Sequence, residues 1–390
     1  MPTALIAGGG IAGMASALAL ARAGWQVEVI EAAPALGEVG AGLQISPNAA
    51  KALDWLGVLP AARAAAMQPE RAEIRDARSG TRLFSTALGA TAERRWGAPY
   101  LHLHRADLLA VLVEAARAAG VTVSLGLRAV RAVTHVNHAA LHLDGQPIRQ
   151  ADLVIGADGI RSALRSGLNR DEAPRFTGQV AWRALIPAER LPASALARVA
   201  TVWAGPGGHL VTYPLRDASL VNLVAVRAQA DWVEEGWSAP GDPEALRRAF
   251  DGWHSEPSAL IAAVETCFLW GLFDRPAQVR WTEGRLALLG DAAHPMLPFM
   301  AQGASQALED AVVLARHLSR AEIPQALADW EEERWPRVAR VIRRAEANGR
   351  MFHARSTLRH LPMRIVSLLA PGLAAAQLDW LYGFDPRPAP

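Results

Sequence analysis

The sequence predicts an α/β fold in which a nucleotide-binding unit is interrupted by a second, mostly antiparallel sheet and followed by a helical tail. Three observations predict it. Residues 5–34 read as strand, glycine-rich turn, helix and strand. Residues 175–275 contain strand-like runs separated by turn residues, and residues 285–318 return to strand, loop and helix. This order places a sheet domain inside a discontinuous nucleotide-binding domain.

The opening stretch has the pattern of a dinucleotide site. Gly8, Gly10 and Gly13 match G-x-G-x-x-G, which provides a tight turn, a close approach to a pyrophosphate and close helix packing. The helix that follows presents free N–H groups to phosphates. Glu31 ends the next strand at a spacing suited to a ribose, and its carboxylate disfavours NADP. The pattern alone leaves NAD and FAD open, and a chance glycine-rich loop is the alternative.

Composition narrows the class of protein. The chain has 390 residues, is 51% hydrophobic and carries a formal charge of +2, which suits a globular protein of two domains. Lysine and arginine form no block, so we expect a mixed surface and no nucleic-acid partner. Cys267 is the single cysteine, which excludes an intrachain disulfide and a cysteine metal cluster. No signal peptide or membrane span is expected, and no metal, so we expect a cytoplasmic protein.

The pattern along the chain divides it into three parts. The nucleotide-binding domain is predicted to comprise residues 1–70, 101–174 and 276–345. The sheet domain is predicted to comprise residues 71–100, expected as short strands and turns, and 175–275. Residues 346–390 are predicted to form a C-terminal helical tail.

Two further motifs identify the nucleotide. "GADGIRSALR", with Asp158, reads as a strand end, a turn and a helix, and "LLGDAAHPMLPFMAQGASQALEDA" contains Asp291. With the opening glycines, and in this order, they resemble the class A flavin-dependent aromatic monooxygenases, the single-component hydroxylases typified by p-hydroxybenzoate hydroxylase and salicylate hydroxylase. The resemblance extends to the closing "WLYGFD". It implies that FAD is bound, in a Rossmann-like domain of the p-hydroxybenzoate hydroxylase kind.

The resemblance also implies a set of FAD-binding residues. They are Gly8, Gly10, Ile11, Ala12, Gly13, Glu31, Leu43, Arg105, Asp158, Asp291, Gly303 and Ala304. Asp291 would accept a hydrogen bond from a ribityl hydroxyl, and Arg105 would hold the phosphates or the ribityl chain. The helix from Gly303 would direct its N–H groups at the flavin pyrimidine ring. From the residues alone, Arg105 also fits a surface helix start and Asp158 a turn aspartate.

One strand-like run carries the candidate base. In a strand over residues 209–213, His209, Val211 and Tyr213 share one face, and a histidine beside a tyrosine could bind and deprotonate a phenol. The run resembles the branch of 3-hydroxybenzoate 6-hydroxylase and 6-hydroxynicotinate 3-monooxygenase, which implies that His209 is the catalytic base and Tyr213 binds substrate. A solvent-exposed or core histidine is the alternative.

Two more residues are expected at the substrate. Gln44 would lie beside the flavin ring and reach the substrate, and Phe299 would contact the substrate. The branch often has polar side chains where Pro298, Phe299 and Met300 stand here, and Gln302 is assigned to the flavin-binding turn. This departure weakens the case for a carboxylate-holding site and favours a ring flanked by apolar groups.

The resemblance implies the reaction. NADH or NADPH would dock transiently, since a second G-x-G-x-x-G is lacking, and O₂ would hydroxylate a small phenolic or hydroxypyridine-type substrate through a C4a-hydroperoxyflavin. The alternatives are an epoxidase or N-hydroxylase on the same fold, an FAD-dependent oxidoreductase without oxygen insertion, and a non-catalytic FAD protein. We expect a monomer or homodimer.

Overall fold

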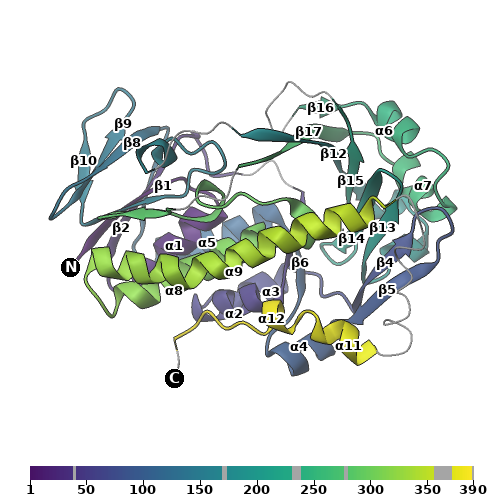
Figure 1. The fold of residues 1–390 in the computed structure, drawn as a ribbon, viewed down its shortest axis with the longest axis horizontal. Helices are drawn as coiled ribbons and strands as arrows, with labels where there is room; N and C mark the ends of the chain where they lie inside the picture. Colours follow the sequence, from purple (N-terminus) through teal and green to yellow (C-terminus); the bar gives the residue numbers. More distant parts are fainter. Residues whose placement is uncertain (38–40, 169–173, 231–238, 276–279, 355–370, 389–390) are drawn as a thin grey trace.

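Two large sheets and a long helix organise the molecule (Figure 1). The computed structural model describes residues 1–37, 41–168, 174–230, 239–275, 280–354 and 371–388. Helix α9 (Ile323–Phe352) contacts β18 of the first sheet and β13 of the second, so it runs along both. None of the helices in these ranges is long and apolar enough to cross a membrane.

The first sheet has the order β18-β19-β11-β1-β2-β7. Its strands are β1 (Thr3–Ala7), β2 (Gln26–Glu31), β7 (Thr122–Leu125), β11 (Leu153–Gly156), β18 (Thr282–Glu283) and β19 (Leu286–Leu288). All neighbours are parallel except β18 and β19. Helices α1 (Ile11–Arg22), α5 (Arg105–Ala118) and α8 (Gly303–Leu318) belong to this half.

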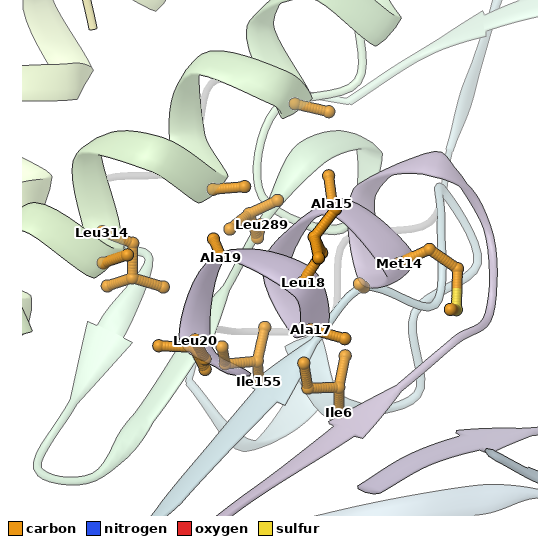
Figure 2. Close-up of a cluster of buried hydrophobic side chains, with 14 of the residues drawn as sticks. Ile6, Met14, Ala15, Ala17, Leu18, Ala19, Leu20, Ile155, Leu289 and Leu314 are labelled. Atoms are coloured by element: carbon orange, nitrogen blue, oxygen red, sulfur yellow. The ribbon is translucent and has the colours of Figure 1, made fainter. Parts of the chain in front are cut away.

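Helix α1 packs closely because small residues, among them Ala15, Ala17 and Ala19, stand between its larger buried side chains. Figure 2 shows Ala15, Leu18 and Ala19 of α1 among Ile6 of β1, Ile155 of β11 and Leu314 of α8. A Cβ atom on Gly13 would lie 1.9 Å from the Gly8 carbonyl oxygen, so only glycine fits there. The helix N-terminus is thereby held against the end of β1.

The second sheet has the order β16-β17-β12-β15-β14-β13-β4-β5. Its strands are β4 (Arg71–Asp76), β5 (Arg82–Ala87), β12 (Arg175–Pro187), β13 (Val199–Gly205), β14 (Gly208–Leu215), β15 (Leu220–Ala228), β16 (Pro240–Gly241) and β17 (Cys267–Asp274). All pairs are antiparallel except β4 with β13. Side chains alternate, so Trp182 and Leu210 face a core with Phe250, next to helices α6 (Pro243–Ala249) and α7 (Ser255–Ala262).

Smaller elements complete the fold. Two short sheets pair β3 (Gly42–Ile45) with β6 (Leu101–His104), and β9 (Ala139–Leu143) with β8 (Ala129–Thr134) and β10 (Arg149–Ala151). The remaining helices are α2 (Pro47–Trp55), α3 (Leu59–Ala64), α4 (Ala90–Trp96), α11 (Pro371–Ala376) and α12 (Asp379–Tyr382). Single 3₁₀ turns occur at Leu164–Gly167, Ala188–Arg190, Ala193–Leu196, Gly290–Ala292 and Pro298–Met300.

The predicted fold class is confirmed, with local corrections. The helix expected after Asp158 is only the 3₁₀ turn Leu164–Gly167, because the Asp158 carboxylate accepts the N–H groups of Ala163 and Leu164 and holds a turn. The expected strands and turns at 71–100 include helix α4. The boundary predicted between residues 345 and 346 falls inside α9, and residues 355–370 of the expected tail lie outside the described residues. The domain boundaries themselves stay a prediction.

Candidate active site

A cavity of about 600 Å³ lies between the two large sheets. One wall consists of the loops after β1, β2, β11 and β19, whose parallel strands all end at the same edge of the first sheet. The opposite wall is the inner face of β12, β14, β15 and β17. In open parallel sheets this edge is where ligands bind. The cavity therefore has a nucleotide side and a second side formed by the inserted sheet.

The glycine-rich turn forms the start of the nucleotide side. Gly8 has a φ of +106°, and a Cβ atom there would lie 2.3 Å from the Ala157 carbonyl oxygen, so this position requires glycine. The turn brings the N-terminus of α1, with Ile11 and Ala12, to the cavity wall. The first N–H groups of a helix lack intrahelical acceptors and suit phosphate oxygens.

Glu31 ties the turn to the end of β2. One carboxylate oxygen accepts the Gly9 N–H at 2.6 Å and the other accepts the Ala33 N–H at 2.7 Å. Glu31 also lines the cavity, so its carboxylate is placed where a ribose hydroxyl could donate to it. The same acid thus shapes the turn and faces the expected adenosine end.

Asp158 carries an unsatisfied buried oxygen. Its Oδ2 accepts the Ala163 N–H at 2.8 Å, whereas its Oδ1 is buried and has no hydrogen-bond partner among the described residues. Burial raises the pKa of this carboxyl group. Buried acceptors are normally paired, so an orphaned oxygen on a cavity wall fits a ligand that donates there.

A charged pair lines the cavity beyond Asp158. Burial raises the pKa of Asp291, and the positive charge of Arg105 opposes that shift. Burial correspondingly lowers the pKa of Arg105, and Asp291 opposes it. A carboxylate and a guanidinium on one wall suit a polyol and a phosphate, the two groups that join the halves of FAD.

The N-terminus of α8 completes the nucleotide side. Gly303 and Ala304 line the cavity, where the helix dipole favours negative charge. Gln302 also lines the cavity, and its side chain holds this turn, since Nε2 donates to Ser46 Oγ at 2.9 Å and Oε1 accepts from Asn48 at 3.2 Å. All twelve expected cofactor residues except Gly13 line the cavity, and Gly13 packs beneath it against Gly8. The residues present fit FAD.

The opposite wall contains the predicted strand. In β14, His209, Val211 and Tyr213 alternate onto the face that lines the cavity. Neighbouring strands add mostly apolar side chains, namely Ala181, Val224, Val226, Trp270 and Leu272. Among the tryptophans of this sheet, Trp270 lines the cavity, whereas Trp182 and Trp203 lie in the core on the other face. A flat apolar ring fits this wall.

His209 has a partner that the sequence did not indicate. It is 2% exposed, and its Nδ1 lies 2.8 Å from Nε2 of His353, the residue that follows α9. Burial holds the pKa of His209 well below its usual range, and the neighbouring His353 lowers it further. The two histidines are 144 positions apart, and no local pattern pairs them.

Phe299 is placed differently from expectation. It does not line the cavity but packs edge-on against the His209 ring, with centroids 5.1 Å apart. Gly349 leaves space for it, since a Cβ atom there would lie 2.6 Å from the Phe299 ring. Phe299 thus supports the His209 ring from outside the cavity lining, and its contact with substrate stays a prediction. Gln44 does line the cavity, and its Oε1 accepts the Tyr100 hydroxyl at 2.6 Å.

Arg183 is a cavity residue that sequence reasoning missed. It donates to the Gly42 carbonyl oxygen at 3.2 Å and lies over the Trp270 ring at 5.1 Å. No carboxylate of the described residues forms an ion pair with it, and burial lowers its pKa. The available signal was an arginine inside the apolar run "GQVAWRALIP".

Comparison with known proteins identifies the family. The model of the FAD binding domain family matches residues 1–345. The chain belongs to this family. It is 41% identical to 3-amino-4-hydroxybenzoate 2-monooxygenase PtnB3 of Streptomyces platensis, covering 99% of this chain and 97% of that one. It is 35% identical to 3-hydroxybenzoate 6-hydroxylase of Polaromonas naphthalenivorans, over 98% and 96%.

Other similarities agree with this assignment. The 6-hydroxynicotinate 3-monooxygenase of Bordetella bronchiseptica is 35% identical over 89% of this chain and 91% of that one. A salicylate hydroxylase–substrate complex superposes with a TM-score of 0.83 at 25% identity, covering 99% of this chain and 96% of the other. Klebsiella pneumoniae HpxO, complexed with FAD and uric acid, superposes with a TM-score of 0.83 at 27% identity over 97% of each chain. The chain is thus an FAD-dependent aromatic monooxygenase, as the resemblance predicted.

Proposed function

We propose that this monooxygenase hydroxylates a small aromatic ring that carries both an ionisable hydroxyl group and a carboxylate. One observation carries the proposal: His209, Tyr213 and Arg183 face a single apolar-walled cavity, opposite the FAD-binding loops. The names of the relatives describe enzymes acting on hydroxybenzoates and hydroxynicotinate, which have both groups. Arg183 favours a substrate with a carboxylate, although the apolar residues Pro298, Phe299 and Met300 gave no reason to expect one.

His209 is proposed as the general base. Its Nδ1 is engaged by His353, so Nε2 is the atom left to take the proton from the substrate hydroxyl. Ionising that hydroxyl raises the electron density of the ring, which an electrophilic oxygen requires. Tyr213 stays protonated because burial raises its pKa, so its hydroxyl donates a hydrogen bond to the substrate oxygen.

Arg183 is proposed to bind the carboxylate. A guanidinium pairs with a carboxylate through two parallel hydrogen bonds, and a dry site strengthens them. The apolar side chains around it, among them Val224 and Trp270, exclude water from the ring. The substrate is thereby oriented by its charge and held by its faces.

The nucleotide side is proposed to hold FAD. Bound FAD supplies the redox chemistry, with NADH or NADPH as electron donor and O₂ as the oxygen source. Gly10 and the start of α1 bind the pyrophosphate, Glu31 the ribose, and Asp291 a ribityl hydroxyl. The N-terminus of α8 at Gly303 stabilises negative charge on the flavin pyrimidine ring. The buried single cysteine, Cys267, fits a reducing cytoplasm.

A substrate panel tests the function. FAD-loaded enzyme is assayed with NADH and with NADPH against 3-hydroxybenzoate, 6-hydroxynicotinate, 3-amino-4-hydroxybenzoate and salicylate, and product and H₂O₂ are quantified. Phenol lacks the carboxylate and benzoate lacks the hydroxyl, so these two rings are the matched controls. We expect at least one hydroxylated acid to give product equal to the NAD(P)H consumed, and benzoate to give only H₂O₂. Equal product from benzoate would contradict the requirement for an ionisable hydroxyl.

A variant pair tests the base. We expect His209→Gln to lower the rate of product formation by roughly 100-fold or more, the usual contribution of a general base. NAD(P)H oxidation should continue with release of H₂O₂. His135→Gln, at an exposed histidine remote from the cavity lining, is the control. A His209→Gln enzyme with unchanged rate and coupling would show that another group removes the proton.

A further inference from the structure

The partner of the candidate base lies between the cavity and the solvent. His209 is almost fully buried, whereas His353 is partly exposed, and 2.8 Å separates their facing ring nitrogens. The backbone of His353 is fixed as well, because its carbonyl oxygen accepts the N–H of Gly207 in the turn between β13 and β14. The two rings are held at a hydrogen-bonding distance by two different elements.

This hydrogen bond determines the tautomers of a functioning base. A hydrogen bond between two imidazole nitrogens contains one proton, which belongs to one of them. If Nε2 of His209 is to accept a proton, neutral His209 must carry its hydrogen on Nδ1. His353 must then accept that hydrogen bond through Nε2 and carry its own hydrogen on Nδ1.

The surroundings of His209 disfavour a lasting positive charge. Its ring packs against the rings of Phe299 and Phe352. No carboxylate of the described residues lies within ion-pair distance of either histidine, and Arg227 is a positive charge close to His353. Burial lowers the pKa of both imidazoles, that of His353 to about 4. A proton that reaches His209 is therefore not retained there.

We propose that His209 and His353 form a proton relay that carries the substrate's hydroxyl proton to solvent; this rests on His209 being the base. The O–H bond of the substrate breaks and an N–H bond forms at Nε2 of His209. In the same movement the Nδ1–H bond of His209 breaks and its proton binds Nε2 of His353. His353 then gives its Nδ1 proton to water.

The relay balances without a net redox change. The substrate becomes a phenolate, water gains one proton, and both histidines end neutral with exchanged tautomers. The reverse transfer returns a proton to the product oxygen and restores the starting tautomers. His353 is thus a residue that acts through His209, not one that contacts the substrate.

Proton release on ligand binding tests the relay. The FAD-loaded enzyme is mixed with saturating 3-hydroxybenzoate in weakly buffered solution containing a pH-indicator dye, and binding is followed separately by flavin absorbance. The key variant is His353→Gln, whose amide oxygen accepts the His209 Nδ1 hydrogen but cannot take its proton. We expect unchanged affinity, and proton release slowed about tenfold or more. Added imidazole should restore the release rate of His353→Ala.

The outcomes separate the relay from the base. Slow release in both His209→Gln and His353→Gln, with normal release in His135→Gln, supports the relay. Slow release in His209→Gln but normal release in His353→Gln overturns the relay and leaves the base intact. Normal release in His209→Gln overturns both. A native enzyme that fails to bind 3-hydroxybenzoate, or releases no proton with it, counts against both.

Discussion

At the scale of single residues, Arg183 sets an expectation about ligand charge. It is a partly buried cation that, among the described residues, binds a carbonyl oxygen and an aromatic face but no carboxylate. Buried charges are normally paired, so a ligand anion would supply the missing partner. The carboxylate of the substrate is the anion that the proposed function provides.

Removing this charge should change selectivity more than the fold. We expect Arg183→Gln to weaken binding of 3-hydroxybenzoate by roughly tenfold or more, because hydrogen bonds between charged groups contribute about 1.5–3 kcal/mol. Phenol binding should change little. Arg175→Gln, at the exposed end of the same strand, is the control, and titration of flavin absorbance gives the affinities. Equal weakening for phenol and for the acid would show that Arg183 does not bind the carboxylate.

Buried histidines should make the fold sensitive to acid. Burial lowers the pKa of His102 to about 3, below the reference value of 6.5. The unfolded chain therefore binds a proton that the folded chain does not, and stability falls as pH decreases below 6.5. We expect His102 to contribute roughly 1.5 kcal/mol of that loss between pH 6.5 and 5. Urea unfolding should show a shallower pH dependence in His102→Leu than in the native chain, and an unchanged slope would contradict the assignment.

The residues whose place on the cavity wall could be expected from the sequence are those with a local signal. The turn at Gly8 and the acids Glu31, Asp158 and Asp291 stand at the ends of recognisable strands, and parallel strands bring those ends to one edge. His353 has no such signal, because its contact with His209 depends on where the end of a long helix meets another sheet. Phe299 lies in the predicted loop, but the loop's 3₁₀ turn directs it behind His209.

At the scale of elements, the contact between α8 and α9 is built on buried charges. Glu309 of α8 accepts hydrogen bonds from Arg334 and Arg337 of α9 and from Asn48 of α2. Asp310 accepts from Arg334 at 2.7 Å. These ion pairs hold the helix whose N-terminus lines the nucleotide side of the cavity.

Neutralising one charge of these buried ion pairs should destabilise the contact between α8 and α9. Glu309→Gln leaves two arginines with less negative charge in a buried site, and breaking a buried ion pair costs about 3–5 kcal/mol. We expect a loss of that order in the free energy of unfolding, measured by urea titration of the FAD-loaded enzyme. Glu346→Gln is the control, because it removes an exposed pair between two residues of α9, Glu346 and Arg350. It should lower the free energy of unfolding by less than about 1 kcal/mol. Equal losses in the two variants would contradict a structural role for the cluster.

The periodic helices were predictable and the short irregular ones were not. Helix α8 has an apolar face at helical spacing, and α9 is a long arginine- and glutamate-rich stretch, so both have the sequence pattern of a helix. Helix α4 has seven residues and begins after a glycine with positive φ, which resembles a turn in sequence. The turn at Leu164–Gly167 was expected as a helix because its capping aspartate also fits a helix start.

At the scale of the whole molecule, the cavity joins segments that are distant in sequence. Its walls come from the N-terminal turn, the inserted sheet and the start of α8. FAD bound there would link both large sheets, so its removal should lower the stability of the entire chain. Free FAD at 100 times its dissociation constant should add roughly 2.7 kcal/mol to the free energy of unfolding.

Fragments of FAD distinguish the contribution of the flavin part of the nucleotide site from that of the adenosine part. We expect the melting temperature of the apoprotein to rise most with FAD and less with FMN, because FMN lacks the adenosine group that Glu31 is expected to bind. ADP, which lacks the flavin, should also give less than FAD. Differential scanning calorimetry of the three mixtures is the measurement, and an increase with FMN equal to that with FAD would contradict an adenosine site at Glu31.

The 30-residue helix α9 has a mechanical consequence, since at 1.5 Å per residue it is about 45 Å long. Arg334 is embedded in the buried cluster, and His353 lies 19 positions farther on, about 28 Å along the axis. If this segment moves as one body, a tilt of about 5° at Arg334 displaces its far end by roughly 2.4 Å, comparable with the 2.8 Å contact to His209. A substitution beside α8 that tilts α9 would then change the distance between His353 and His209 without touching the substrate.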